Sequence, residues 1–222
     1  MAEPTDPRAT AGTTTGTTTG TTTVVRETRE TQIRVALGRG EGRADVDTGE
    51  PFLDHMLAAL ARYAGLDLAV RARGDLKHHL IEDVGIAVGE ALRAFAPATA
   101  ARYGDRTVPM DDALVHASVD LGGRAWYEGP LPARLYDHWM QSFAFNARAT
   151  LHLRVLRGRD RHHVVEAAFK ALGLALRDAL ADTGAVFSTK GAVATVVSSA
   201  ADGEAGEGGG AGAGAGDVVG RT

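Results

Sequence analysis

The stretch His78-His79-Leu80-Ile81-Glu82 occurs a second time in the chain, as His162-His163-Val164-Val165-Glu166. Each copy follows an Asp-His pair, with 23 positions from His55 to His78 and 24 from His138 to His162. Six of the eight histidines lie in these two units. Imidazole and carboxylate groups together suit first-row divalent metals. The repeat therefore predicts a duplicated metal-binding site and an internally duplicated fold.

Helical spacing supports this interpretation, because Glu82 lies four residues after His78 and three after His79, so we expect all three on one helix face. Alanine and leucine follow both motifs with helical periodicity, which predicts ligands at the beginnings of helices. One such motif alone is usually a solvated or packed helix face, but two matched copies favour a two-metal site. Four ligands per metal are expected, and the sequence leaves their partition open. The candidate ligands are His55, His78, His79, Glu82, His138, His162, His163 and Glu166.

Composition limits the class of protein. The 222 residues are 44% hydrophobic, and no run of eighteen apolar residues occurs, so we expect a soluble chain with no membrane partner. The absence of cysteine excludes disulfides and thiolate ligands and fits the reducing cytoplasm, which is the default location. A net charge of −4 and 5% aromatic residues argue against nucleic-acid binding.

The two ends of the chain differ from its middle. Residues 1–23 are rich in Thr and Gly, and residues 198–222 are rich in Gly and Ala, so we predict a disordered leader and a disordered tail. The duplicated motif divides the remainder into two half-domains, residues 24–105 and residues 106–197, each with one His-His-x-x-Glu motif.

Both half-domains show the same order of patterns. In the first, residues 31–37 alternate like a strand, residues 51–64 are helical around Asp54-His55, and residues 67–72 alternate again before the ligand helix. In the second, strands are expected at residues 111–120, 124–127 and 150–156, and a helix at residues 135–147. Interleaved strands and helices predict an α+β fold of the α/β sandwich type, in which helices pack between β-sheets.

Several further motifs occur in the order seen in one enzyme family. They are Thr28-Arg29-Glu30-Thr31, Asp47-Thr48-Gly49, Phe52-Leu53-Asp54-His55-Met56-Leu57, Gly74-Asp75-Leu76, Arg102-Tyr103-Gly104, Pro109-Met110-Asp111, Asp120-Leu121-x-Gly123-Arg124 and Ser188-Thr189-Lys190-Gly191. With the two His-His-x-x-Glu motifs they cover essentially the whole predicted folded region. The chain resembles imidazoleglycerol-phosphate dehydratases.

This resemblance implies a histidine-biosynthesis enzyme with a duplicated half-domain like domain 2 of ribosomal protein S5. It implies dehydration of D-erythro-imidazole glycerol phosphate to imidazole acetol phosphate, with two Mn²⁺ ions per active site, in a homo-oligomer of 24 subunits built from trimers. Active sites form between subunits in this family. The chemistry agrees, because two Lewis acids on the imidazole ring would let it act as an electron sink, through a metal-bound imidazolate and a diazafulvene-like intermediate.

Roles for individual residues follow from the same resemblance. Glu30 is a candidate general acid or base, or it holds a substrate hydroxyl, and Glu82 and Glu166 join it as candidate catalytic carboxylates. Lys170 either approaches the substrate or pairs with Glu166, one helical turn away. Guanidinium, ammonium and hydroxyl groups suit a phosphate. The candidate substrate-binding residues are Glu30, His55, Arg102, Arg124, Lys170, Ser188, Thr189 and Lys190.

The chain also departs from the family pattern. The segment from Gly74 to His79 is three residues shorter than usual and lacks the Asp-Asp pair that commonly precedes the histidines, so we expect carboxylate support for these ligands to be lost. Asp112 replaces a usual Glu. Two alternatives therefore stay open: a diverged relative that uses the dimetal site on another phosphorylated substrate, and a non-catalytic oligomer held together by metals.

Overall fold

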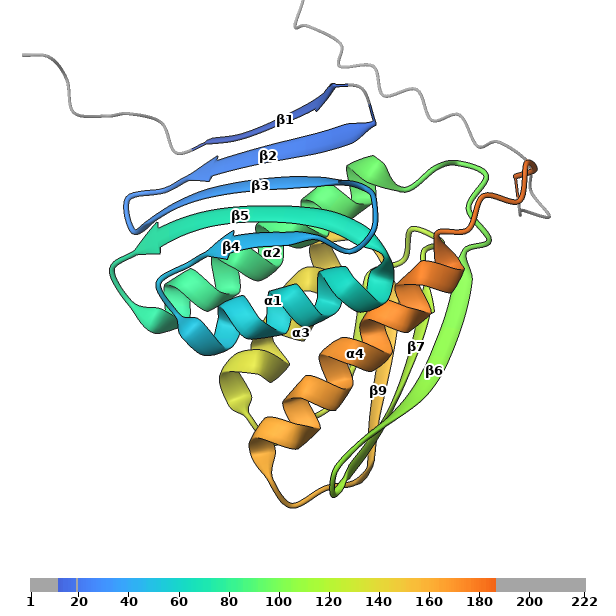
Figure 1. Ribbon diagram of the computed structural model, residues 1–222. Coiled ribbons are helices and arrows are strands. Elements are labelled where there is room, and N and C mark those ends of the chain that lie inside the picture. The colour runs from blue at the N-terminus through green and yellow to red at the C-terminus, as the bar shows by residue number, and fades with distance from the viewer. Residues whose placement is uncertain (1–11, 19, 187–222) are drawn as a thin grey trace, which may run out of the picture. The chain divides into compact units, whose positions relative to one another are not determined.

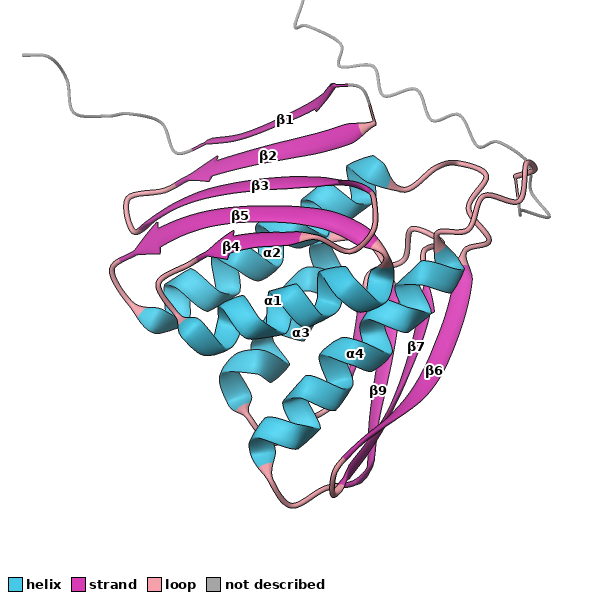
Figure 2. Ribbon diagram, in the orientation of Figure 1, coloured by secondary structure: helices cyan, strands magenta, loops and turns pink. Residues whose placement is uncertain are grey.

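The computed structural model describes residues 12–18 and 20–186 and contains two β-sheets and four helices in these ranges (Figures 1 and 2). The elements, in chain order, are β1 (Gly12–Thr18), β2 (Thr21–Glu27), β3 (Thr31–Arg39), β4 (Ala44–Asp47), α1 (Pro51–Ala64), β5 (Leu66–Gly74), α2 (Lys77–Phe95), β6 (Tyr103–Met110), β7 (Ala113–Asp120), β8 (Trp126–Glu128), α3 (Arg134–Asn146), β9 (Thr150–Arg157) and α4 (Arg161–Ala179).

The two sheets repeat one topology. The first has the strand order β1-β2-β3-β5-β4 and the second the order β6-β7-β9-β8. In each, a short strand runs parallel to its neighbour, β4 beside β5 and β8 beside β9, while the other pairings are antiparallel. If β1 is set aside, both halves have the chain order β-β-β-α-β-α.

The helices lie between the sheets, as Figure 2 shows. Helices α1 and α2 pack on the first sheet, and α3 and α4 pack on the second. Across the middle, α1 contacts α4 and α2 contacts α3. The predicted α+β class with helices between sheets is confirmed. Each helix pair therefore joins one helix from each half of the chain.

The core follows from alternating and helical patterns in the sequence. Along β7, buried residues alternate with partly exposed ones, because successive side chains of a strand point to opposite faces. Among the helices the largest buried side chains are aromatic: Trp139 stacks on Phe143 with ring centroids 5.2 Å apart and lies 4.7 Å from the ring of Phe169. This cluster fixes α3 against α4.

Some predicted boundaries were wrong. Residues 12–18 form β1, paired in register with β2 from Thr21 onward, so the predicted disordered leader does not hold for residues 12–18 and 20–23. Threonine is β-branched and favours strands, and here it extends a sheet edge. The strand expected at residues 111–120 is β7, whereas β6, which precedes it in a hairpin, was not expected, and the proposed boundary between residues 105 and 106 falls inside β6.

The predicted tail at residues 198–222 lies outside the described residues. Within residues 12–18 and 20–186, the helices are too short or too polar for any of them to cross a bilayer.

Candidate metal centre

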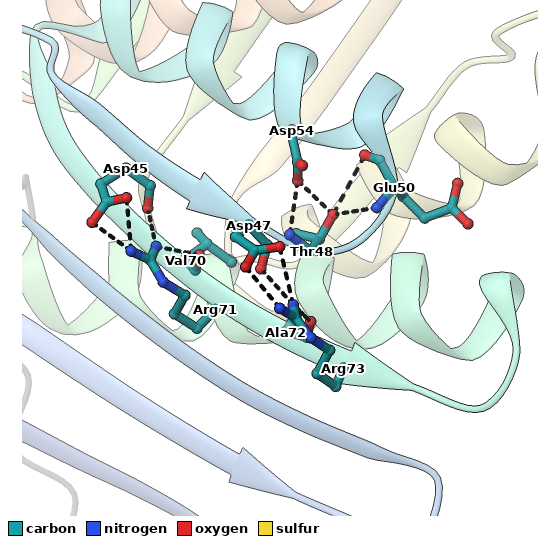
Figure 3. A network of polar contacts seen from close by, with 9 residues as sticks. All are labelled: Asp45, Asp47, Thr48, Glu50, Asp54, Val70, Arg71, Ala72 and Arg73. Carbon is teal, nitrogen blue, oxygen red and sulfur yellow. Dashed lines mark hydrogen bonds and ion pairs between the residues drawn. The ribbon is translucent and has the colours of Figure 1, made fainter.

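The first turn of α1, which carries His55, is anchored to the end of β4 (Figure 3). Asp54 Oδ1 accepts hydrogen bonds from the Thr48 backbone N–H at 2.9 Å and from its hydroxyl at 2.6 Å. The preceding Asp47 forms an ion pair with Arg73 of β5 at 2.7 Å. The Asp-His pair of the sequence is therefore one anchoring residue followed by one candidate ligand.

The beginning of α2 is connected to the same network. Lys77, its first residue, forms an ion pair with Glu50, the residue at the N-cap position of α1. Figure 3 shows Glu50 at the end of the Thr48–Asp54 network. Because Lys77 precedes His78, this ion pair links the two helix ends that carry His55 and His78.

The second half repeats the anchoring with different residues. Asp137 Oδ1 accepts hydrogen bonds from the Leu131 backbone N–H at 2.8 Å and from the Tyr127 hydroxyl at 2.6 Å, at the beginning of α3. Asp160 caps α4 by accepting a hydrogen bond from the backbone N–H of His162 at 2.8 Å. The histidines near each helix beginning are thus held by local polar contacts.

His55 of α1 and His162 and Glu166 of α4 form what we call the α1–α4 cluster, with ligand atoms all within 4.8 Å of one another. Glu166 Oε2 lies 3.3 Å from His55 Nε2 and 3.1 Å from His162 Nε2. Its other oxygen pairs with Lys170 Nζ at 2.9 Å. Burial acts to raise the pKa of Glu166, but hydrogen bonds from Lys170 and His55 outweigh it and lower that pKa. The carboxylate is thereby held ionised, as a metal ligand must be.

His78 and Glu82 of α2 and His138 of α3 form the α2–α3 cluster, which has the same composition and the same 4.8 Å limit. The two oxygens of Glu82 lie 3.6 Å from His78 Nε2 and 3.6 Å from His138 Nε2. Both clusters combine a His and a Glu four residues apart on one helix with a His from the facing helix. Two imidazoles and one carboxylate fit a divalent first-row metal and leave coordination positions open.

His79 and His163 join neither cluster in the described part of the chain. His79 Nδ1 lies 3.1 Å from Asp75 Oδ1 and 3.3 Å from Glu30 Oε2. His163 Nδ1 lies 2.7 Å from Asp112 Oδ1. The hydrogen bond from His163 is the largest cause that lowers the pKa of Asp112 to about 2. In turn, the hydrogen bond to Asp75 raises the pKa of His79, and the hydrogen bond to Asp112 raises the pKa of His163.

One expectation about the histidines was therefore wrong, because adjacent histidines do not share a helix face. Each cluster of one chain has three ligands, and four ligands per metal stays a prediction about the assembled protein. Residues one apart are rotated by about 100° around a helix, so His78 points to the cluster and His79 points away from it. The expected loss of carboxylate support at the shortened segment does not hold for His79, because Asp75 supplies this support.

The other predicted site residues fall in several places. Lys170 pairs with Glu166, as one of its two expected roles requires, and Glu30 lies beside His79. Arg124 is exposed. Ser188, Thr189 and Lys190 lie outside the described residues.

Arg102 lines a cavity of about 510 Å³ near the end of α2. Its guanidinium pairs with Asp120 through Nε, 2.6 Å from Oδ1, and through Nη2, 3.0 Å from Oδ2. Arg93 and Arg148 also line this cavity, and the sequence reasoning missed both. No spacing in the sequence connects them, although Arg148 follows the end of α3 in a left-handed conformation with φ of 50°. Three guanidiniums and one carboxylate give the cavity a net positive charge.

Known proteins share this sequence and this fold. A family model described as imidazoleglycerol-phosphate dehydratase matches residues 48–176. The imidazoleglycerol-phosphate dehydratase of Desulforudis audaxviator is 47% identical over 189 residues, which cover 77% of this chain and 96% of that protein. The one from Salinibacter ruber is 47% identical over 190 residues, covering 77% and 94%.

Two solved structures are similar as well. A crystal structure of the Pyrococcus furiosus protein of this name gives a TM-score of 0.70 at 42% identity and covers 76% of this chain and 99% of that one. The Staphylococcus aureus imidazoleglycerol-phosphate dehydratase gives a TM-score of 0.63 at 33% identity, covering 68% and 95%.

Proposed function

The chain belongs to the imidazoleglycerol-phosphate dehydratase family, whose members are dehydratases of histidine biosynthesis, and we propose that it converts D-erythro-imidazole glycerol phosphate to imidazole acetol phosphate with two Mn²⁺ ions per active site. The observation that carries this proposal is the pair of clusters. Both have two imidazoles and one carboxylate, in equivalent places of the duplicated fold. We expect the reaction to take place in the reducing cytoplasm, which the absence of cysteine fits.

We propose that a complete active site needs more than one copy of the chain. His79 and His163 lie outside both clusters of their own chain, on the surface, where they can supply the missing fourth ligands to clusters of neighbouring copies. Their side chains are 32% and 29% exposed, so they are accessible to another subunit. A homo-oligomer of 24 subunits built from trimers, as the family resemblance implies, would satisfy this requirement.

The phosphate-binding residues support the same conclusion. His78 is near the beginning of α2, whereas Arg93 and the cavity of Arg102 are near its end. Fifteen residues of helix separate His78 from Arg93, which is on the order of 20 Å at 1.5 Å per residue. Only three carbons join the ring and the phosphate of the substrate. One molecule therefore cannot reach the α2–α3 cluster and the Arg102 cavity of the same chain.

Bound Mn²⁺ would act as a Lewis acid that lowers the free energy of negative charge on the imidazole ring. The chain supplies the remaining functions. Lys170 keeps Glu166 ionised, and Glu30, exposed beside His79, is the candidate to move the proton of the ring-bearing carbon. Arg102, with Arg93 and Arg148 in the same cavity, would hold the phosphate dianion, and Arg124, Ser188, Thr189 and Lys190 would complete its site.

The test is dehydration of imidazole glycerol phosphate by the metal-stripped protein before and after addition of Mn²⁺, followed through the acetol product. We expect turnover only with Mn²⁺. The variant His138→Ala should lose this turnover, whereas His152→Ala, an exposed histidine on β9 outside both clusters, should keep it. Absence of turnover despite bound Mn²⁺ would instead support a diverged relative or a non-catalytic oligomer.

A further inference from the structure

The two histidines outside the clusters share a feature that the four cluster histidines lack. His79 Nδ1 lies 3.1 Å from Asp75 Oδ1, and His163 Nδ1 lies 2.7 Å from Asp112 Oδ1. Within the described residues, the cluster histidines contact their carboxylates through Nε2, and none has a hydrogen bond at Nδ1. The same arrangement therefore arises twice, once in each half of the chain.

The two carboxylates come from different parts of the chain. Asp75 precedes α2 and lies four residues before His79, whereas Asp112 is in the β6–β7 turn, 51 residues before His163. Local sequence spacing cannot explain both contacts, because only the first lies within one helical turn. The same geometry is reached by two different routes, and this points to a shared requirement of the two histidines.

Both carboxylates are themselves held in place. Asp112 Oδ2 accepts hydrogen bonds from the backbone N–H groups of Arg159 at 2.6 Å and Asp160 at 3.2 Å. Asp75 Oδ1 accepts one from the backbone N–H of Leu76 at 2.6 Å. A carboxylate fixed to the backbone can fix the imidazole ring that it contacts.

We propose that Asp75 and Asp112 are positioning residues that orient His79 and His163 so that Nε2 of each can bind a metal ion held by another copy of the chain. A carboxylate that accepts the Nδ1–H hydrogen bond selects the tautomer with a free lone pair on Nε2 and makes the ring a stronger ligand. This inference rests on the proposed function. It also explains how the shortened segment between Gly74 and His79 keeps a working ligand, because Asp75 replaces the missing Asp-Asp pair.

Neighbouring carboxylates contact the same rings more weakly. Glu30 lies 3.3 Å from His79 Nδ1, and Asp111 lies 3.4 Å from His163 Nε2. Both distances are longer than an ordinary N–H···O hydrogen bond. The Asp111 side chain is 69% exposed, so it can move away when Nε2 takes a metal.

The test compares Mn²⁺ affinity of the full-length assembled protein by titration calorimetry in wild type, Asp75→Asn and Asp112→Asn. We expect each substitution to weaken Mn²⁺ binding 10–100-fold, as loss of a carboxylate behind a ligating histidine typically does. Asp112→Glu should restore affinity to within a few-fold, because it keeps the acceptor. The matched control is Asp105→Asn, which removes an exposed carboxylate from β6 of the same hairpin and should bind Mn²⁺ as wild type does.

Thermal unfolding of the metal-free variants separates positioning from a structural role. Unchanged Mn²⁺ affinity in both Asn variants, or a loss of affinity matched by an equal loss of stability without metal, would overturn the inference. If the wild-type protein binds Mn²⁺ and dehydrates imidazole glycerol phosphate, the proposed function stands even when this inference fails. Wild-type protein that binds no Mn²⁺ would overturn both.

Discussion

Replacing Gly89 by alanine should damage one metal cluster and spare the other. A Cβ atom at Gly89 of α2 would lie 2.5 Å from the Phe143 carbonyl oxygen and 2.9 Å from the Ala147 nitrogen of the α3 end. Ordinary contact begins near 3.4 Å, so the two helices would need to separate by about 0.9 Å. Both atoms belong to the backbone, which cannot rotate away as a side chain can. The variant must therefore shift α3 relative to α2.

The magnitude follows from two opposing effects. Overpacking a tight contact typically costs about 1–3 kcal/mol, whereas alanine is about 1 kcal/mol better than glycine inside a helix. We expect Gly89→Ala to lower the free energy of unfolding by up to about 2 kcal/mol. The same shift would change the position of His138 relative to His78 and Glu82. The carboxylate oxygens of Glu82 already lie 3.6 Å from Nε2 of His78 and 3.6 Å from Nε2 of His138. Mn²⁺ affinity should fall at the α2–α3 cluster.

Gly173→Ala is the reciprocal control. Its Cβ atom would lie 2.9 Å from the Leu60 carbonyl oxygen, at the equivalent crossing of α4 and α1, and should weaken the α1–α4 cluster instead. The assays are urea unfolding of the metal-free proteins at one protein concentration and Mn²⁺ titration. A double-mutant cycle shows which cluster loses Mn²⁺ affinity. In the His138→Ala background, Gly89→Ala should lower Mn²⁺ affinity little further, whereas in the His55→Ala background it should have its full effect. Equal or higher stability of Gly89→Ala, with both sites unchanged, would refute this reasoning.

Three further predictions follow from the contacts. His79→Ala and His163→Ala should each abolish turnover, although neither lies in a cluster of its own chain, and near-normal turnover in either would contradict ligands supplied by another copy. Lys170→Met leaves the buried Glu166 carboxylate with only its two histidine contacts and should destabilise the metal-free protein by about 3 kcal/mol, measured by urea unfolding. Unchanged stability would contradict a stabilising ion pair. Burial raises the pKa of Glu90 above its ordinary 4.5, so folding favours the protonated form and wild type should lose stability relative to Glu90→Gln as pH rises from 4 to 8. Parallel pH profiles of unfolding for the two proteins would contradict this.

Much of the fold could be predicted from the sequence because the relevant signals are local. Alternation along β7 and helical spacing after both His-His-x-x-Glu motifs are set by the geometry of single elements. The hairpin of β6 and β7 was missed because its turn, at Asp111, has φ of 46° in a residue other than glycine. β1 was missed because Thr-Gly repeats carry no apolar pattern.

The candidate site divides in the same way. The types of ligand and their helices were predictable, since a His and a Glu four residues apart must meet on one helix face. The partition of the ligands between the two clusters could not be predicted, because it depends on which helices face each other. The third ligand of each cluster comes from a helix of the other half of the chain, and no local spacing encodes that pairing.

The duplicated α+β fold and its two sets of imidazole and carboxylate side chains could be predicted from the sequence, because residue type and periodicity act within single elements. Packing between distant elements was needed to show that α1 contacts α4 and α2 contacts α3, that Lys170 pairs with Glu166, and that His79 and His163 point away from both clusters. These outcomes depend on helix-to-helix distances of a few ångströms. Close packing at Gly89 and Gly173, between residues far apart in the chain, sets those distances.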